Sequence, residues 1–323
     1  MTSPQAAADA AIGVPQMFTI HHLIWLHRYG YLPNLPYELG PFPITLDFAS
    51  TGQFDKRLRE QLTDWGVIDV ARNALVPEAD DLFGALTGFS EWALWGTILL
   101  YSLRTNARET FDPGGADDWG LKHAVRDVPR VPFMIAVRNR EIISAISTPD
   151  ALLINRIDRV GDVHQQVGRI LKEMLDPENL WEPWGGPTIS VPHRTVKSLA
   201  ADPSVSSMSG DDDADAREAR ATNTKNALMG AELSPATSKV LVELQRSPTT
   251  ASVQVAINYT ASHGQVTPDL AVGVTFFDGA GIVVSYPVGR TDETRSIRYV
   301  PGDEKGFTDA VASLVAAADS VHF

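Results

Sequence analysis

Apolar residues recur at every third or fourth position in some segments, as in helices, and at every second position in others, as in strands. These segments alternate along the chain, and the same series of segments occurs twice. Residues 77–86 begin with Pro77 and several acids, which favour the first turn of a helix, and residues 91–104 form a predicted long strand. A hairpin over 131–147 turns at Arg138-Asn139-Arg140, and a strand at 151–157 and a helix at 160–175 follow. Residues 235–318 repeat the order helix, strand, hairpin, strand, helix, with the hairpin turn at Asp278-Gly279.

The two series also align residue by residue. Residues 75–101 match residues 233–259 without a gap at an offset of 233 − 75 = 158, so that Leu86 meets Leu244 and Tyr101 meets Tyr259. Few residues are identical, but apolar positions remain apolar. This pattern predicts an internal duplication, in which two diverged copies of one β/α unit make up the chain.

The remaining segments set the expected boundaries. Residues 1–16 are predicted to be a disordered tail, 17–175 the N-terminal half, 176–232 a linker of helix and loop, and 233–323 the C-terminal half. Residues 18–21 are predicted to begin as a strand and continue into a short helix ending near Gly30. The Ser/Asp/Ala-rich stretch 198–221, acidic at 211–215, is expected to be a solvated, flexible insert whose purpose stays open.

Composition narrows the class of protein. The chain has 323 residues, 44% hydrophobic and 21% charged, and a net charge of 27 − 40 = −13, which disfavours nucleic acid and anionic membrane surfaces as partners. It has no cysteine, so disulfides and thiolate metal sites are excluded. No apolar run approaches the roughly 20 residues of a membrane span, and the N-terminus lacks the pattern of a signal peptide. These features predict a soluble, cytoplasmic protein.

Motifs of enzymes and cofactor sites are lacking in the sequence. His21, His22 and His27 do not have the i, i+4 spacing of a helical metal pair, and no catalytic-serine, zinc-protease or P-loop pattern occurs. DGAGIVV at 278–284 begins like a dinucleotide fingerprint, but a strand follows where phosphate binding needs a helix. We therefore predict no catalytic residue, cofactor or metal, although an enzyme assembled from distant residues stays open.

Three features suggest a binding surface. On the strand at 92–101, Trp92, Leu94, Ile98 and Leu100 point one way and Trp95, Leu99 and Tyr101 the other, so either both faces are buried or one is exposed for a partner. The loop 105–130 is long in one copy only and is either an interface or a floppy loop. The last strand carries a basic stripe, either a solvated edge or a contact for an acidic helix. The predicted partner-binding residues are Trp92, Phe111, Asp112, Asp117, Asp118, Trp119, Leu121, Arg290, Arg295 and Arg298.

Two stretches resemble a known family. FTIHHLIWLHRYGYLPNLP leading to LREQLTDWGVI, and VTFFDGAGIVVSYPVGRTDETRSIRYVPGDEKGFTDAVASLV at the end of the chain, are similar to the EspG family of cytosolic chaperones in actinobacterial type VII (ESX) secretion. The resemblance implies an α+β fold, with a central antiparallel sheet built from two quasi-two-fold-related halves and flanked by helices. It also implies binding of a PE–PPE heterodimer at the tip of the PPE protein, which covers an apolar patch and keeps the substrate soluble for export.

The leading prediction is therefore a non-enzymatic chaperone for a helical secretion substrate, present as a monomer or a homodimer. One alternative is a small-molecule-binding or catalytic domain that uses a groove between the two halves. Another is a structural homodimer whose exposed sheet face meets itself. The sequence does not reveal which PE–PPE substrate or which ESX system is involved.

Overall fold

The computed structural model describes residues 18–40, 52–88, 91–103, 128–148, 151–206, 214–231, 233–261, 264–268, 270–289 and 295–319. These residues divide into two compact units. The first unit takes the described residues up to Gly96 together with Val131–Gly161 and Asn258–Thr267, and the second unit takes the rest. The strands β3 and β8 contribute residues to both units.

The first unit combines helices with part of an antiparallel sheet. Its helical elements are α2 (Ile20–Arg28), η1 (Tyr37–Leu39), α3 (Gly52–Asp64) and α4 (Pro77–Thr87). Its strands, including the two that are shared, are β1 (Ile68–Asp69), β2 (Ala74–Leu75), β3 (Trp92–Leu100), β4 (Arg130–Arg138), β5 (Glu141–Ser147), β6 (Leu152–Asp158), β8 (Thr249–Ala261) and β9 (Gly264–Val266).

The second unit contains a further part of that sheet and most of the long helices. Its helical elements are η2 (Tyr101–Leu103), α6 (Val163–Leu175), α7 (His193–Ala201), α8 (Pro203–Ser206), α9 (Ala214–Leu228), α10 (Pro235–Arg246) and α11 (Glu304–Asp319). Besides its parts of β3 and β8, its strands are β7 (Ile189–Pro192), β10 (Ala271–Phe277), β11 (Gly281–Val288) and β12 (Ser296–Pro301).

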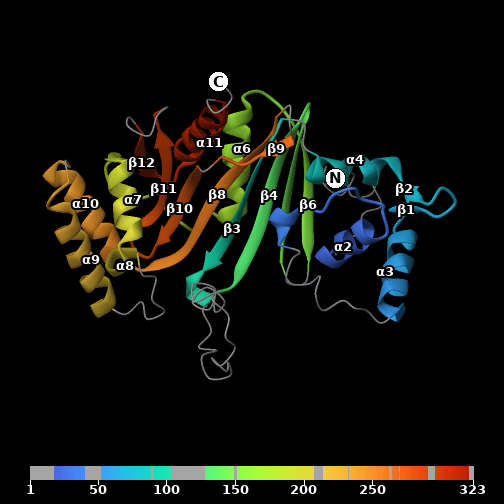
Figure 1. Ribbon diagram of the computed structural model, residues 1–323, viewed down its shortest axis with the longest axis horizontal. Helices are drawn as coiled ribbons and strands as arrows, with labels where there is room; N and C mark the ends of the chain where they lie inside the picture. Colours follow the sequence, from blue (N-terminus) through green and yellow to red (C-terminus); the bar gives the residue numbers. More distant parts are fainter. Residues whose placement is uncertain are drawn as a thin grey trace. The chain divides into compact units, whose positions relative to one another are not determined.

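In the described part of the chain, the strand order of the large sheet is β6-β5-β4-β3-β8-β10-β11-β12-β7, with β9 paired to β8 off this path (Figure 1). Counted outward from the middle of the sheet, one side has β3, β4, β5 and β6, and the other side has β8, β10, β11 and β12. On both sides the strands therefore follow their order in the chain. Each set of four is preceded by one helix (α4 or α10) and followed by another (α6 or α11). The predicted α+β fold with a large antiparallel sheet flanked by helices is confirmed, and so is the repeated order of elements.

The start of the chain differs from the sequence prediction. The strand predicted for residues 18–21 is wrong, because α2 already begins at Ile20. Thr19 is the N-cap, and its backbone N–H donates to Nδ1 of His22 at 3.1 Å, so the histidine supplies the reciprocal bond of a capping box. Phe18 and Leu23 are fully buried in the core that α2, α3 and α4 form with β4 and β5.

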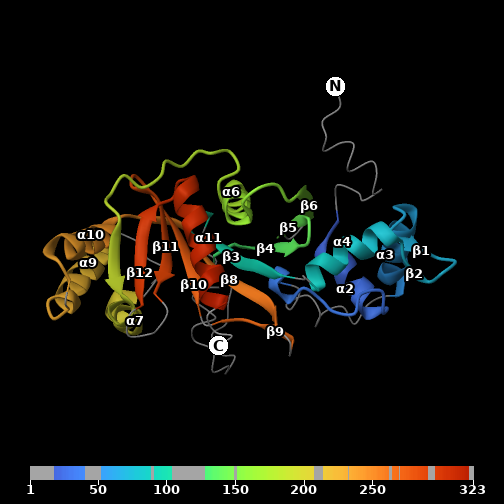
Figure 2. The same cartoon turned by 90° about the horizontal axis from the view of Figure 1, so that it is seen from above.

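In the second unit, α6 and α11 pack side by side (Figure 2). Both helices bury apolar side chains, with Val167 at 0% and Leu171 at 1% exposure on α6, and Phe307 at 0% on α11. A Cβ atom added at Gly168 would lie 2.9 Å from the backbone nitrogen of Thr308, so this glycine allows the two helices to approach closely. α6, which lies in the predicted N-terminal half, is therefore held in the second unit.

The two hairpin turns form where the sequence predicts them. Asn139 has φ 50° and Gly279 has φ +71°, the left-handed conformation that asparagine and glycine adopt most readily. Among the described helices, none combines the length and apolar character that crossing a membrane requires.

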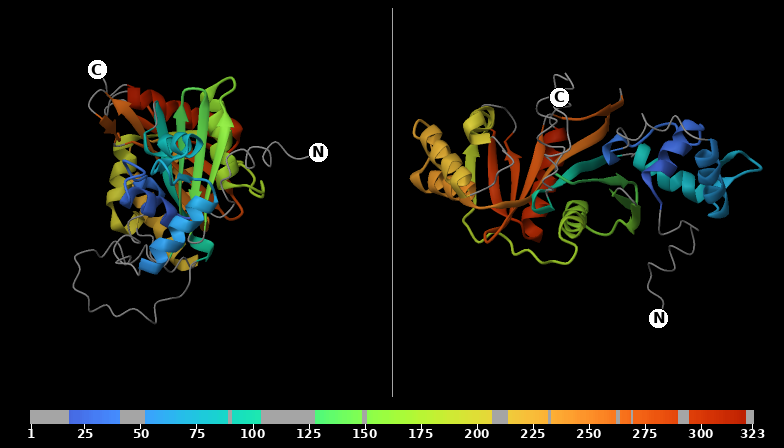
Figure 3. Two further views of the ribbon diagram at one scale, coloured as in Figure 1. Left: turned by 90° about the vertical axis from the view of Figure 1, so that its right-hand side faces the viewer. Right: turned by 90° about the horizontal axis from the view of Figure 1, so that it is seen from below.

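The linker is more ordered than predicted. Residues 214–221 of the expected flexible insert belong to α9, where Ala221 is fully buried, so that expectation is wrong for this stretch. α9 packs on α10, and Arg246 donates to both carboxylate oxygens of Glu218 at 2.7 and 2.8 Å (Figures 1 and 3). Residues 189–192, expected to be loop, form β7 on the outer side of β12.

Candidate partner-binding surface

The sheet in the second unit has one covered face and one open face. On β10, Val272, Val274 and Phe276 are at most 3% exposed, whereas the alternate residues between them are half-buried. Because side chains alternate along a strand, the two sets lie on opposite faces. Val274 and Phe276 pair with Val284 and Ile282 on β11, the strand on which α11 packs, so the buried set faces this helix.

The register extends the open face across neighbouring strands. Gly273 lies opposite Gln254 on β8 and Ser285 on β11, and Ser285 lies opposite Tyr299 on β12. The hydroxyl groups of Tyr101 and Ser252 are 3.1 Å apart, which adds the first residue of η2, directly after β3. We define the open face as Leu99, Tyr101, Ser252, Gln254, Ala256, Ala271, Gly273, Thr275, Phe277, Ser285 and Tyr299.

The chemistry of the open face suits contact with another polypeptide. Its centre consists of small residues, such as Ala256, Gly273 and Ser285, and the hydroxyl group of Ser285 lies over Gly273 and donates to its carbonyl oxygen at 3.3 Å. Larger rings, Tyr101, Phe277 and Tyr299, lie toward its margins. The residues that define the open face carry hydroxyl and amide groups but no formal charge, so such a partner would bind through apolar contact and hydrogen bonds.

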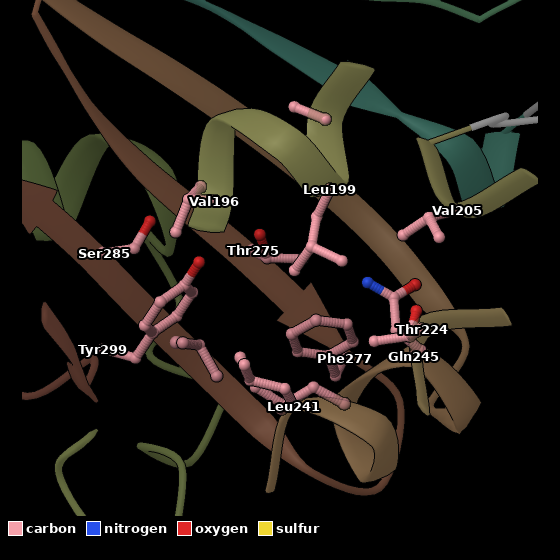
Figure 4. A pocket seen from close by; sticks show the side chains of 13 residues that line it. Val196, Leu199, Val205, Thr224, Leu241, Gln245, Thr275, Phe277, Ser285 and Tyr299 are labelled. Carbon is pink, nitrogen blue, oxygen red and sulfur yellow. The ribbon is translucent and has the colours of Figure 1, made fainter. Parts of the chain in front are cut away.

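At one end of the open face, the helices of the linker and α10 form a wall. A pocket of about 260 Å³ lies between this wall and the strands (Figure 4). α7, α8 and α10 contribute Val196, Leu199, Val205, Leu241 and Leu244, whereas the strands contribute Thr275, Phe277, Val283, Ser285 and Tyr299. Apolar side chains from both sides therefore border a half-open pocket that is large enough for a ring or a branched aliphatic group.

Two polar groups in this pocket have unusual environments. Thr224 on α9 is 1% exposed, and its hydroxyl group has no hydrogen-bond partner among the described residues. Burial raises the pKa of Tyr299 to about 12, because the ionised phenolate would lose its hydration. Tyr299 is therefore protonated at neutral pH, and its hydroxyl group can donate a hydrogen bond.

The two faces of β3 differ in burial for their largest side chains, although Leu100 is half-buried and Ala93 on the other face is fully buried. Trp92, Leu94 and Ile98 are at most 8% exposed, whereas Trp95, Leu99 and Tyr101 are half-buried. Trp95 packs against the core of the first unit and its indole N–H donates to the side-chain oxygen of Asn258 at 3.0 Å, so neither of the two alternatives describes this strand fully. Trp92, a predicted partner-binding residue, lies on the buried face, so its position contradicts the expectation that its indole is available to a partner.

Of the three residues of the predicted basic stripe, the structure describes Arg295 and Arg298, and only Arg298 lies within β12. Arg298 is next to Tyr299 on the strand, so it projects from the face opposite the open face. β12 is also not a solvated edge, which was one of the two alternatives, because β7 pairs with it and the backbone N–H of His193 donates to the carbonyl oxygen of Arg295 at 2.9 Å. Arg290 and the loop residues Phe111, Asp112, Asp117, Asp118, Trp119 and Leu121 lie outside the described residues.

The histidines near the N-terminus have structural contacts. His22 is buried and lies 3.4 Å from the side-chain oxygen of Gln61, and Nδ1 of His27 lies 3.0 Å from the carbonyl oxygen of Leu32. Burial lowers the pKa of His22 from 6.5 to about 4, since the charged ring would lose its hydration. Among the described residues, no three His, Asp or Glu side chains gather in a way that could hold a metal ion.

Sequence reasoning missed most of the open face and the pocket. The alternation of small polar and apolar residues in SVQVA on β8 and AVGVTFF on β10 was a usable signal for a half-covered sheet face. No comparable signal marks Thr224, because its burial depends on where α9 packs.

Comparisons with known proteins give one kind of match. No protein-family model matches the chain, and no curated protein does. Among solved structures, the chain is similar to the Mycobacterium tuberculosis type VII secretion system chaperone EspG5, determined in complex with a PE25–PPE41 dimer. The similarity covers 80% of this chain and 84% of that chain, with a TM-score of 0.56 and 12% sequence identity. At this identity the likeness shows an EspG-like fold.

Proposed function

We propose that this protein is a non-enzymatic, cytoplasmic chaperone that binds a PE–PPE-type helical substrate of type VII secretion and keeps it soluble for export. The observation that carries the proposal is the fold likeness over 80% of the chain to a chaperone bound to a PE25–PPE41 dimer. The resemblance of the two sequence stretches to the EspG family points in the same direction.

The open face is the surface that we propose for binding. A helix tip has closely spaced apolar side chains on a narrow end, and the small residues around Gly273 let such an end approach the sheet. The rings of Tyr101, Phe277 and Tyr299 offer apolar contact beside it. A stable complex of this kind buries at least about 1,000 Å² in total, so we expect the linker helices to contribute to the interface as well.

Specificity for one substrate is proposed to come from residues outside the sheet. The loop 105–130 carries Phe111, Trp119 and Leu121 among acidic residues, and aromatic anchors in a polar surround are typical of protein interfaces. Arg290 and Arg295 remain proposed contacts for an acidic substrate. Arg298 is a weaker proposal, because it projects from the covered face of the sheet.

Co-purification with a substrate tests the proposal. The full chain is co-expressed with candidate PE–PPE dimers, and the mixture is separated by gel filtration with light scattering. We expect one dimer to elute with this chain as a 1:1:1 complex. If each of the candidates elutes separately while the chain elutes as a symmetric homodimer, the structural-homodimer alternative replaces the chaperone function.

A pair of matched variants locates the interface. Gln254 is exposed in the middle of the open face, and Gln165 is exposed on α6 in the same unit. We expect Gln254→Trp to weaken co-elution because the indole occupies the space of the partner, whereas Gln165→Trp leaves it unchanged. Equal binding by the two variants would place the interface away from the open face.

A further inference from the structure

We propose that the pocket between the linker helices and the open face is a binding site for an uncharged, mainly apolar small molecule that carries a hydroxyl or carbonyl group. This inference goes beyond the proposed chaperone function and does not depend on it. It concerns a free ligand that occupies the pocket of the second unit in the absence of a protein partner.

The volume and the lining of the pocket indicate the size and the apolar part of the ligand. Its volume of about 260 Å³ is just below the range of roughly 300–1,000 Å³ that is typical of drug-sized ligands, so the ligand is small. Leu199 on α7, Leu241 on α10 and Phe277 on β10 provide apolar walls from three elements. An aromatic or branched aliphatic body gains the most from such a lining, because apolar contact is made on several sides.

The charge of the ligand follows from the same lining. Among the described residues, none that lines the pocket has a charged side chain. An ionised ligand would lose its hydration without gaining a counter-charge, which is costly in an apolar pocket. Carboxylates, phosphates and amines are therefore excluded, and an uncharged molecule remains.

Thr224 indicates the polar group of the ligand. Buried hydroxyl groups in proteins are almost always hydrogen-bonded, yet the hydroxyl of Thr224 has no partner among the described residues. Even the carbonyl oxygen one turn earlier in α9, the usual partner of a helical threonine, does not accept from it. The hydroxyl group has almost no accessible surface, so a ligand hydroxyl or carbonyl group would satisfy it after a small shift of the side chains that cover it.

A second set of polar groups lies on the strand side. Ser285 and Tyr299 are cross-strand neighbours that line the pocket, and Figure 4 shows Phe277 and Leu199 between Tyr299 and Thr224 in that view. The protonated Tyr299 is available as a donor. The pocket thus combines an apolar middle with hydrogen-bonding groups on the helices and on the strands, which suits an apolar molecule with one or two oxygen atoms.

Titration of the full chain with 2-naphthol tests the inference, with naphthalene as a matched probe that lacks the hydroxyl group. Binding is followed by shifts of backbone amide NMR signals. We expect saturable shifts for 2-naphthol at Thr224, Gln245 and Tyr299. Their absence, or shifts spread evenly over the surface, would overturn the proposal.

Variants identify the pocket and its polar group. Leu199→Trp fills the pocket and should raise the Kd of 2-naphthol at least about tenfold, whereas Leu180→Trp, the same change at a residue that is 73% exposed, should alter it less than about twofold. Thr224→Val should raise the Kd of 2-naphthol by about two- to tenfold and leave that of naphthalene unchanged.

Two further outcomes are decisive. If Leu199→Trp does not fold, as judged by its circular dichroism and melting curve, Thr275→Phe fills the pocket from the strand side and is expected to give the same loss of affinity. Unchanged affinity in a folded pocket-filling variant would refute the site, and an equal effect of Thr224→Val on both probes would refute the role of its hydroxyl. No measurement includes a PE–PPE partner, so failure here leaves the chaperone proposal standing.

Discussion

Replacing Gly168 by alanine should loosen the contact between α6 and α11. The added Cβ atom would lie 2.9 Å from the nitrogen and 3.0 Å from the Cα atom of Thr308, and 3.1 Å from the carbonyl carbon of Phe307. Carbon atoms in good contact are about 3.5–4.0 Å apart, so the helices must separate by roughly 0.5–1 Å. The neighbouring atoms belong to the backbone and cannot rotate away, so this strain is not relieved by a change of rotamer.

The expected cost follows from two opposing effects. Overpacking a tight core costs about 1–3 kcal/mol, and the better helix propensity of alanine returns up to about 1 kcal/mol. We therefore expect the free energy of unfolding to fall by about 1–2 kcal/mol and the melting temperature of the 323-residue chain by about 1.5–3 °C. Differential scanning calorimetry and urea unfolding of the full chain measure both quantities.

The control for this prediction is another helical glycine. Gly84 on α4 has more room, because the nearest atom to an added Cβ is the end of the flexible Arg138 side chain at 3.7 Å. Gly84→Ala should therefore be neutral or stabilise the protein by up to about 1 kcal/mol. If Gly168→Ala were as stable as Gly84→Ala, the inference that α6 and α11 need a glycine at their contact would be refuted.

Three further predictions concern pH, a helix cap and the partner. Burial lowers the pKa of His22 to about 4, so protonation of His22 favours the unfolded chain, and the free energy of unfolding should fall as the pH decreases from about 6.5 to about 4. His22→Gln should reduce this loss by about 2 kcal/mol. Urea unfolding at the two pH values measures the difference. The hydroxyl of Ser234 accepts from the backbone N–H of Thr237 at 3.1 Å, so Ser234→Ala should cost about 1 kcal/mol and Ser234→Asp should restore it in the same assay. Trp119→Ala should weaken substrate binding in calorimetric titration without lowering the melting temperature, and unchanged affinity would show that the long loop is not an anchor.

Local signals in the sequence predicted the repeated elements well. The hairpin turns at Asn139 and Gly279 are strong signals, because few residues adopt a left-handed conformation easily. The helices that begin at Pro77 and Pro235 have proline at the first position, where its missing N–H has no cost. Each of these features depends on neighbours in the chain and not on distant contacts.

The candidate site was harder to predict, because its position depends on distant contacts. Thr224 is one of several polar residues in an Ala-rich segment, and the sequence does not distinguish it from Asn223 or Lys225. It is buried because α9 packs on α10, and β7 covers the edge of the sheet where we expected exposed arginines. The Ser/Asp/Ala-rich composition was therefore a poor predictor of disorder for α9, because this helix is ordered by its packing on α10.

The open face also explains why both sides of β3 are apolar in the sequence. One side, with Leu94 and Ile98, is buried in the protein itself. The other, with Leu99 and Tyr101, remains half-buried, although covering it would bring a favourable hydrophobic gain. A sheet face that keeps large apolar groups only partly covered, beside small residues such as Gly273, is typical of a surface completed by another molecule. The two proposals differ in what completes it: a helix tip over the centre of the face, and a small uncharged ligand in the pocket at its end.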